Sequence, residues 1–319
     1  MVITLGNIVF GGKGNGGGAP AAYVVPNGMN FGYSTLIPFD DFDFSQRTNF
    51  DHCWYYCSKL TSFPQLDLSS GTNFQYAWSY CSSLTEFPQL DLSSGTNFSS
   101  AWSNCNKLTE FPQLDVHNGR TFMRAWENCT SLTSFPQLDL SSGTNFQYAW
   151  RFCSKLKEFP ALNLSKGTEF YYTWSNCSKL TSLPQLDLSS GTNFGYAWEN
   201  CKSLASFPAL DLSSGTSFLN AWNGCSLLAD FAQVDLSAGT NFTNAWAGCS
   251  ALTNLGGFGA IKNSFSLSAS TKLTAESLMN VINQAATVTG KTMTLGSANL
   301  AKLTDEQKAV ATSKGWTLA

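Results

Sequence analysis

A repeat of 24 residues runs through most of this 319-residue chain without an insertion or a deletion. The unit from Cys57 to Tyr80 reads CSKLTSFPQLDLSSGTNFQYAWSY, and it recurs until about residue 250. Nine cysteines from Cys57 to Cys249 mark the repeat, and a tryptophan stands three residues before each. A fixed period of about 20–50 residues is typical of solenoids and propellers, in which stacked units share one core. We therefore expect one continuous array and not two globular domains.

Each unit divides into two halves joined by a turn. The alternation in residues 66–68 (LDL) predicts a short strand with one buried face, and residues 69–71 (SSG) predict a turn. Apolar residues then follow with the i, i+3, i+4, i+7 spacing that gives a helix of about two turns its apolar stripe. They are Phe74, Ala77, Trp78 and Cys81. The sequence predicts an α/β solenoid of strand–turn–short-helix units with one parallel sheet.

The first half of the unit has the spacing L-x-x-F-x-x-L-x-L of a leucine-rich repeat with a helix on the convex side. The unit resembles the BspA-type leucine-rich repeats of bacterial surface proteins, with their blocks C-x-x-L-t-x-(L/F)-p-x-L-d-L-s and (N)-(F/M)-x-x-(A/M)-(W/F). This resemblance covers roughly residues 36–260. The carboxyl end is similar to the cap on such arrays in proteins of gut bacteria and their phages. The resemblance implies a recognition surface and no chemistry.

Three segments are expected. Residues 1–20 form an N-terminal strand and a glycine-rich tether, which we interpret as an attachment peptide in preference to a plain linker. Residues 21–260 form the leucine-rich-repeat solenoid, and residues 261–319 form a C-terminal α/β cap that continues it. The cap is predicted to hold helices over about 275–286 and 305–314, the second opened by a capping box.

Composition limits the partners. Charged residues make up only 12% of the chain and the net charge is −3, with no basic block, so nucleic acid is not expected. No apolar run approaches the ~20 residues that span a bilayer, and the first ten residues do not read as a secretory signal. The apolar and aromatic content is ample for the core of an array, which single units could not form alone.

The cysteine pattern does not suggest a metal or a cofactor. No short C-x-x-C spacing occurs, and parallel Cβ vectors on adjacent rungs are poorly oriented for disulfides. We expect free thiols that serve as packing residues. Cys53 and Cys57, one expected helical turn apart, are the pair to inspect.

An acidic ladder is expected at the exposed centre of the LDL strand. It consists of Asp43, Asp67, Asp91, Asp115, Asp139, Asp187, Asp211 and Asp235, with Asn163 in the one gap. At ~4.8 Å spacing, neighbouring carboxylates repel by about 0.9 kcal/mol in a water-like dielectric. Hydrogen bonds from flanking side chains, with partly raised pKa values, would offset this. Cation binding along the row is the alternative, although no unit resembles a calcium loop.

The expected helix face is where units differ most, because the strand face repeats almost unchanged. An outward aromatic patch is predicted there, and it would suit sugar stacking or a protein interface. Its residues are Tyr148, Phe152, Tyr171, Tyr172 and Tyr196. The alternatives are that these rings only cover the rungs, or that a repetitive ligand such as a glycan binds the uniform strand face.

The sequence favours a non-catalytic recognition protein over an enzyme. It has only two histidines, His52 and His117, and no nucleophile elbow, phosphate loop or paired catalytic carboxylates. The leading hypothesis is a phage virion component, exposed to the medium, held by its N-terminal strand to a virion or surface protein and presenting its array to a host glycan or protein. The alternatives are a bacterial cell-surface adhesin and a purely structural spacer.

Overall fold

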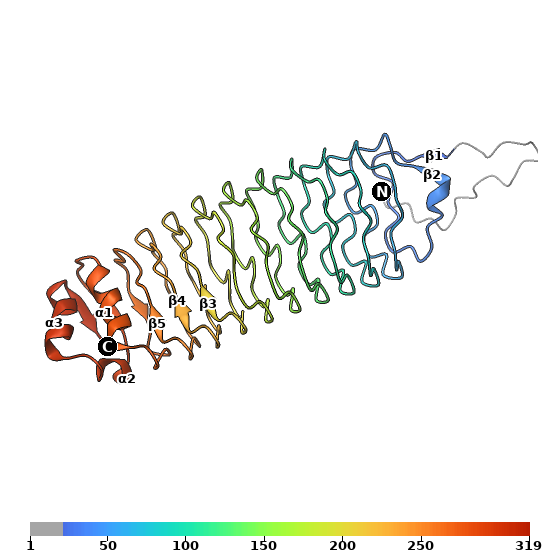
Figure 1. Cartoon of the computed structure of the whole chain (residues 1–319). Coiled ribbons are helices and arrows are strands. Elements are labelled where there is room, and N and C mark those ends of the chain that lie inside the picture. Colours follow the sequence, from blue (N-terminus) through green and yellow to red (C-terminus); the bar gives the residue numbers. More distant parts are fainter. Residues whose placement is uncertain (1–21) are drawn as a thin grey trace, which may run out of the picture.

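The rungs stack side by side into a long rod (Figure 1). The computed structural model describes residues 22–319, so the strand and tether expected over residues 1–20 lie outside the described residues. A row of parallel β-bridges runs along the rod from Asn49–Asn73 to Ser217–Asn241, and each joins residues 24 apart. The chain is therefore a repeat solenoid, as the period predicts.

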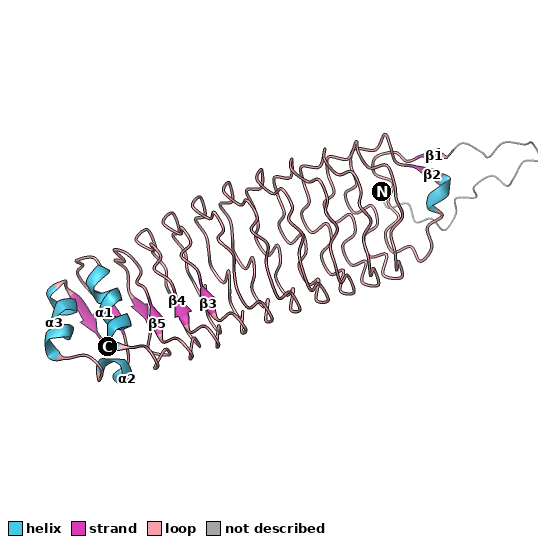
Figure 2. Cartoon of the chain, in the orientation of Figure 1, coloured by secondary structure: helices cyan, strands magenta, loops and turns pink. Residues whose placement is uncertain are grey.

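The short helix expected in each unit is not present. Between the 3-10 helix η2 (Phe39–Asp41) and helix α1 (Ala275–Gln284), the described chain holds turns and five strands of two residues each (Figure 2). The segment from Phe74 to Cys81 is instead a run of tight turns, because the amides of Ala77 and Cys81 donate to the carbonyls of Phe74 and Trp78, three residues earlier. The helix prediction is wrong.

Alternate amides of this segment bond to the next rung. The N–H groups of Phe74, Tyr76, Trp78 and Tyr80 donate to carbonyls of residues 97, 99, 101 and 103 at 2.8–2.9 Å. A helix would satisfy its amides internally, so stacked helices would forgo this ladder. The apolar spacing that predicts a helix also fits a chain of turns, since both place Phe74, Trp78 and Cys81 on one side.

Each rung requires two residues with a positive φ, at the third position of successive turns, as in type II turns. They form two columns, one from His52 to Asn244 and one from Tyr56 to Asn200 that continues into Gly224 and Gly248. Left-handed backbone costs a residue with a Cβ about 1–2 kcal/mol. Asparagine tolerates it best, which explains its frequency in both columns.

The LDL segments do not form regular strands. The strands of the array lie earlier in the unit, at β3 (Ser206–Phe207), β4 (Asp230–Phe231) and β5 (Asn254–Leu255), and they pair in parallel. Earlier rungs lack these strands because they carry proline, which has no amide N–H to continue the ladder. Pro64 and its counterparts stand there in earlier rungs, whereas Ala232 and Gly256 donate to the carbonyls of Phe207 and Phe231 at 3.0 and 2.9 Å.

The core consists of columns of identical side chains. Nine tryptophans from Trp54 to Trp246 are fully buried, and neighbouring indoles stack at 5.3–5.9 Å. A phenylalanine column from Phe50 to Phe242 stacks beside them, with 5.1–5.7 Å between the centroids of neighbouring rings. Because each ring contacts the rungs on both sides, burial depends on neighbours and a single unit has no core of its own.

The C-terminal segment builds a separate parallel sheet, in the order β6 (Phe265–Ser266), β7 (Lys291–Thr294) and β8 (Trp316–Leu318). Helices α1 and α3 (Asp305–Ser313) match the two predicted helices, and the capping box at Thr304 is confirmed. A short helix α2 (Ser297–Leu300) was not predicted. Among residues 22–319, no helix is long and apolar enough to cross a membrane.

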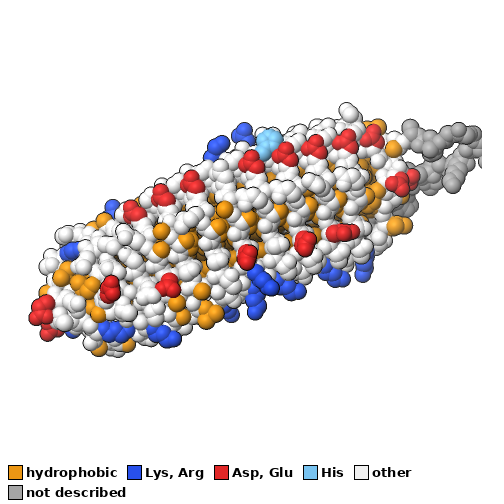
Figure 3. Space-filling view, in the orientation of Figure 1, with side chains coloured by type: hydrophobic (Ala, Val, Ile, Leu, Met, Phe, Trp, Pro, Cys, Tyr) orange, Lys and Arg blue, Asp and Glu red, His pale blue; other side chains and the backbone are white. Residues whose placement is uncertain are grey.

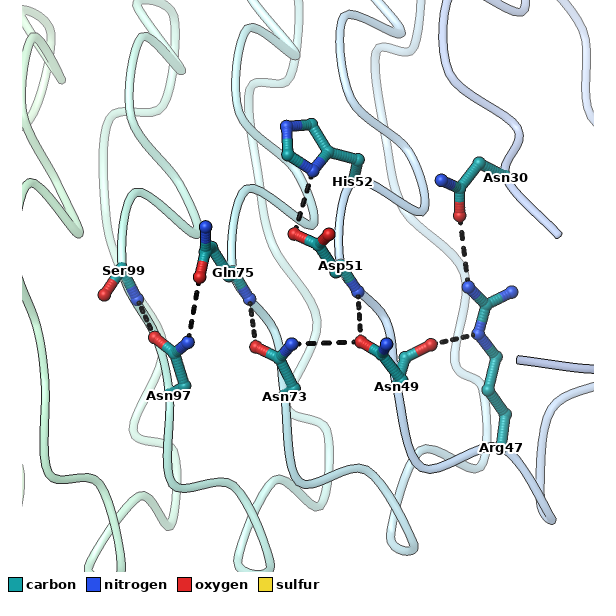
Figure 4. A network of polar contacts seen from close by, with 9 residues as sticks. All are labelled: Asn30, Arg47, Asn49, Asp51, His52, Asn73, Gln75, Asn97 and Ser99. Atoms are coloured by element: carbon teal, nitrogen blue, oxygen red, sulfur yellow. Dashed lines mark hydrogen bonds and ion pairs between the residues drawn. The ribbon is translucent and has the colours of Figure 1, made fainter. Parts of the chain in front are cut away.

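The N-terminal end holds an additional, incomplete rung. Strand β1 (Tyr23–Val24) pairs with β2 (Phe42–Asp43), and Phe31 and Tyr33 donate amides to the carbonyls of residues 53 and 55. Buried Arg47 fixes this rung through the carbonyls of Met29 and Asn49 and the side chain of Asn30, and an amide row continues from it (Figure 4). Leu36, which the repeat assigns to an inward row, is 84% exposed because no complete rung precedes it among the described residues.

Candidate functional site

The acidic ladder takes part in turns. Each aspartate accepts, through Oδ1, the N–H of the residue two positions later at 2.9–3.2 Å. At Asp91 the Ser93 hydroxyl donates to the same oxygen at 2.7 Å. Asn163 receives the same two bonds from Ser165, at 3.1 and 2.8 Å. A neutral amide oxygen thus does what the carboxylates do, and the shared role is that of a turn acceptor.

These bonds change the expected pKa values. Hydrogen bonds from the following serine hold the pKa of Asp43, Asp91, Asp139 and Asp211 below the usual range. For these four residues the prediction of partly raised pKa values is wrong, because the donated hydrogen bonds favour the ionised form and outweigh the effect of burial. At His117, whose Nδ1 lies 2.6 Å from Asp115, the carboxylate raises the pKa of the imidazole.

Charge is arranged in columns along the rod. Lys59, Lys107, Lys155 and Lys179 share one exposed position of the rung, and Glu86, Glu110 and Glu158 share another. The space-filling view shows acidic side chains in rows parallel to the rod axis, with Lys and Arg along the lower long edge and a few on the upper one (Figure 3). Among the described residues, no group of three or more His, Cys, Asp or Glu side chains could hold a metal ion.

The cysteines form a buried column. All ten are free thiols, including Cys53 and Cys57, and from Cys81 onward each Sγ–H donates to the carbonyl of a tryptophan 27 residues earlier, at 3.2–3.3 Å. Burial raises the pKa of Cys129 and Cys177 to about 12. These thiols are packing residues, as the sequence suggests.

Four of the five residues of the predicted aromatic patch are in mutual contact. Tyr148, Tyr172 and Tyr196 stack at 5.1 and 4.2 Å with 7° between their planes, and Tyr171 meets each of them edge-on. Gly195 allows this arrangement, since a Cβ there would lie 3.0 Å from the Tyr171 ring. Burial raises the pKa of Tyr171 and Tyr172.

Neighbouring groups cover faces of the rings of Tyr148 and Tyr172. One face of Tyr148 lies against Tyr172 and the guanidinium of Arg124 lies 4.4 Å from its centroid, while Tyr172 lies between Tyr148 and Tyr196. All five residues of the patch are half-buried. A sugar cannot stack on Tyr172, because both of its faces are covered, so a ligand at this ring would contact its edge and the neighbouring polar groups.

An ion-pair cluster adjoins the patch, and sequence reasoning missed it. Glu127 is 5% exposed, and its two carboxylate oxygens accept from Arg124 and Arg151, each at 3.1 Å. The Arg151 guanidinium lies over Phe152 at 4.5 Å, Tyr172 at 4.9 Å and Tyr148 at 5.4 Å. Phe152 is thus linked to the tyrosines through Arg151.

A second aromatic surface lies at the N-terminal end of the rod, on the column of Phe152, which is adjacent to the column of Tyr148, Tyr172 and Tyr196. Tyr33, Tyr56 and Tyr80 stack at 5.1 and 5.3 Å and are 64%, 41% and 39% exposed. Tyr55 packs edge-on against Tyr33 and Tyr80, and also meets His52. We call the columns that carry both ring clusters the tyrosine face. Tyr33 was missed because the first rung is one residue out of step with the repeat.

Comparison with known proteins gives little. No family model and no curated protein matches the chain. It is similar to a solved leucine-rich repeat protein from Bacteroides ovatus at 12% sequence identity, with a TM-score of 0.32; the match covers 84% of this chain and 80% of that one. The solenoid is established from the rungs of this chain themselves.

Proposed function

We propose that this chain is a non-catalytic recognition protein that binds its partner through the tyrosine face. The observation that carries the proposal is the exposed stack of Tyr33, Tyr56 and Tyr80, bordered by Tyr55 and His52. Exposed aromatic clusters with few charges are typical of the centres of binding interfaces. Rigid tyrosines lose little conformational entropy when they bind, and serine and asparagine supply adaptable hydrogen bonds.

The rod is proposed to be held at its N-terminal end. Six of the seven exposed large hydrophobic side chains among the described residues lie between residues 23 and 80, and four of them, Tyr23, Val24, Tyr33 and Leu36, belong to the first rungs. Residues 1–20 directly precede this apolar end. We infer a BspA-type leucine-rich-repeat array with a C-terminal cap, mounted through residues 1–20 as a phage virion component and exposed to the medium.

Two alternatives make different predictions. A bacterial cell-surface adhesin would use the same face but would be found on uninfected cells. A structural spacer is favoured by the stack at Tyr172, because both faces of this ring lie against neighbouring tyrosines. A spacer predicts that changes on the tyrosine face leave binding unaltered.

The binding test uses the double variant Tyr56→Asn, Tyr80→Asn. Asparagine occupies the same positive-φ column at residues 104, 128, 176 and 200, so the backbone is expected to tolerate it. Labelled protein would be applied to a panel of host cells. We expect the double variant to lose most cell binding, whereas Leu227→Lys, which removes a 57% exposed apolar side chain at the position held by lysine in other rungs, should bind normally. Equal binding by all three proteins would rule out the tyrosine face.

The location is tested separately by immunogold electron microscopy of an infected culture, with an antibody against the repeats. Gold at a defined place on virions is expected. Gold on uninfected cells would favour the adhesin. Unchanged incorporation into particles after deletion of residues 1–20 would contradict the proposed mount.

A further inference from the structure

Two arginines stand out on a face that otherwise has little charge. In the rung positions that build the tyrosine face, the described residues include only two permanent cations, Arg124 and Arg151, on neighbouring rungs. Both donate through Nη1 to the buried carboxylate of Glu127 at 3.1 Å, one to each oxygen. The triad Arg124–Glu127–Arg151 therefore carries a net charge of +1.

The guanidinium groups are held in place by rings as well as by Glu127. The Arg124 guanidinium lies 4.4 Å from the Tyr148 centroid, and the Arg151 guanidinium contacts Phe152 at 4.5 Å and Tyr172 at 4.9 Å. Cation–π contacts of this kind fix the plane of the guanidinium. A donor fork fixed before binding loses less conformational freedom when a ligand arrives.

Donors remain on these groups. An arginine has five N–H donors in a planar fork, and each of these two gives one hydrogen bond to Glu127. The Arg124 side chain is 42% exposed and that of Arg151 is 27% exposed, so part of each fork faces solvent. The geometry of the fork matches the two oxygens of a carboxylate.

The neighbouring acids already have partners. Glu169 accepts from Gln147 and Asn193 at 3.2 and 3.3 Å, and Glu199 accepts from Ser175 at 3.2 Å. Burial raises the pKa of Glu199. The remaining donors of Arg124 and Arg151 are therefore the strongest anion-binding groups on this face.

The column beside the triad carries amides at regular intervals. Asn104 and Asn128 stand on successive rungs, joined by a side-chain hydrogen bond of 3.1 Å, and Asn176 follows beyond Phe152. A row of amides parallel to the rod suits a ligand with repeating hydroxyl groups. Guanidinium groups beside such a row suit a polymer whose sugar units carry carboxylates.

We propose that Arg124 and Arg151 bind the carboxylate groups of an acidic polysaccharide that lies along the tyrosine face. This inference rests on the proposed recognition function and names the ligand class of its central part. The ring clusters then supply edges and apolar walls, while the two guanidinium groups supply the charge that selects an acidic chain over a neutral one.

The test measures binding of the full chain to polygalacturonate, with neutral dextran and dextran sulfate as comparison polymers. The key variant is Arg124→Gln, which leaves the Arg151–Glu127 pair in place, and thermal melting checks that the variant is folded. Arg120→Gln is the matched control, since Arg120 is an exposed arginine in a different column, four positions before Arg124 in the same rung. Arg124→Lys keeps the charge but loses the fork.

We expect the wild type to bind polygalacturonate and not dextran, Arg124→Gln to bind at least about tenfold more weakly, and Arg120→Gln to stay within about twofold. Arg124→Lys should also bind more weakly, because a lysine makes no planar fork. An equal loss in Arg120→Gln, equal binding to dextran, or a preference for dextran sulfate would each overturn the proposal. If no polysaccharide binds while the tyrosine variants still lose cell binding, this inference fails and the recognition function stands.

Discussion

Replacing Gly143 by alanine should destabilise the array although it adds a single methyl group. The new Cβ would lie 2.4 Å from Cζ of Phe146 and 3.1 Å from the carbonyl oxygen of Leu140. Carbon atoms in contact prefer about 3.5–4.0 Å, so the ring would have to retreat by about 1 Å. It has no room to do so, because Phe146 is fully buried with Phe122 and Phe170 each 5.7 Å away.

The expected cost follows from two opposing terms. Overpacking a filled core costs about 1–3 kcal/mol, and the reduced freedom of the unfolded chain returns about 0.4–1 kcal/mol. Gly143 does not have a positive φ, so alanine adds no backbone strain. We expect a net loss of about 1–2 kcal/mol in the free energy of unfolding.

Urea unfolding followed by circular dichroism would measure this loss as a lower midpoint at an unchanged slope. A double-mutant cycle identifies the cause: in a Phe146→Leu background the ring is gone, so Gly143→Ala should cost close to nothing. Ser142→Ala, a neighbouring change outside the core, is the control. The same loss in the presence and absence of the Phe146 ring would refute the steric explanation.

Three further outcomes are expected. The ten buried thiols should not react with Ellman's reagent in the folded protein and should all react in urea, since burial raises their pKa, to about 12 at Cys53; rapid reaction of the folded protein would contradict this. The melting temperature should fall when the pH drops below about 4. Aspartates with a lowered pKa contribute stability that is complete above their usual pKa of about 3.9 and is lost as the pH falls through the pKa of the folded protein. The double variant Asp91→Asn, Asp139→Asn should show a weaker dependence on pH, and a wild-type slope in that variant would be evidence against this explanation. Arg47→Met should speed amide exchange in residues 22–34 and leave the later rungs protected, because it removes bonds to Met29, Asn30 and Asn49; unchanged exchange would show that Arg47 does not hold the first rung.

Periodicity predicts the stacking of this protein better than the path of each rung. The 24-residue repeat places Trp54, Trp78 and their counterparts in one column, because translation along the rod follows directly from sequence spacing. The helix prediction fails because Phe74, Trp78 and Cys81 lie on one side of a turn chain as well as of a helix. What decides between them is whether amides bond within a rung or across rungs, and hydrophobic spacing contains no information on that choice.

One local signal was present in the sequence. Asparagine recurs at residues 104, 128, 176 and 200, and glycine follows at 224 and 248, which is the set of residues that tolerates left-handed backbone. Tyrosine at positions 56 and 80 obscures the signal. The strands were likewise marked by the loss of proline at Ala232 and Gly256, whose amides complete a ladder that Pro64 interrupts.

The candidate site was predicted in part. The 24-residue spacing places Tyr148, Tyr172 and Tyr196 in one column. It cannot show that the rings cover one another, since that depends on side-chain rotamers. Glu127 and Arg151 occupy a rung position filled by serine in several other units, so neither forms a repeating pattern. Their association depends on contacts between neighbouring rungs that only the folded chain reveals.

The likeness of successive rungs makes the alignment of the chain with itself ambiguous. Residues 62–78 and 134–150 are identical, so either segment would fit the neighbours of the other. A chain that looped out one whole unit would still place tryptophan on tryptophan and cysteine on cysteine. Contacts that occur only once remove the ambiguity. The hydrogen bonds between Arg151 and Glu127 and between Ser79 and Ser103 form only when no unit has been skipped. These unique pairs fix the register of a stack that is otherwise periodic. The least repetitive rungs therefore specify one alignment for all the others.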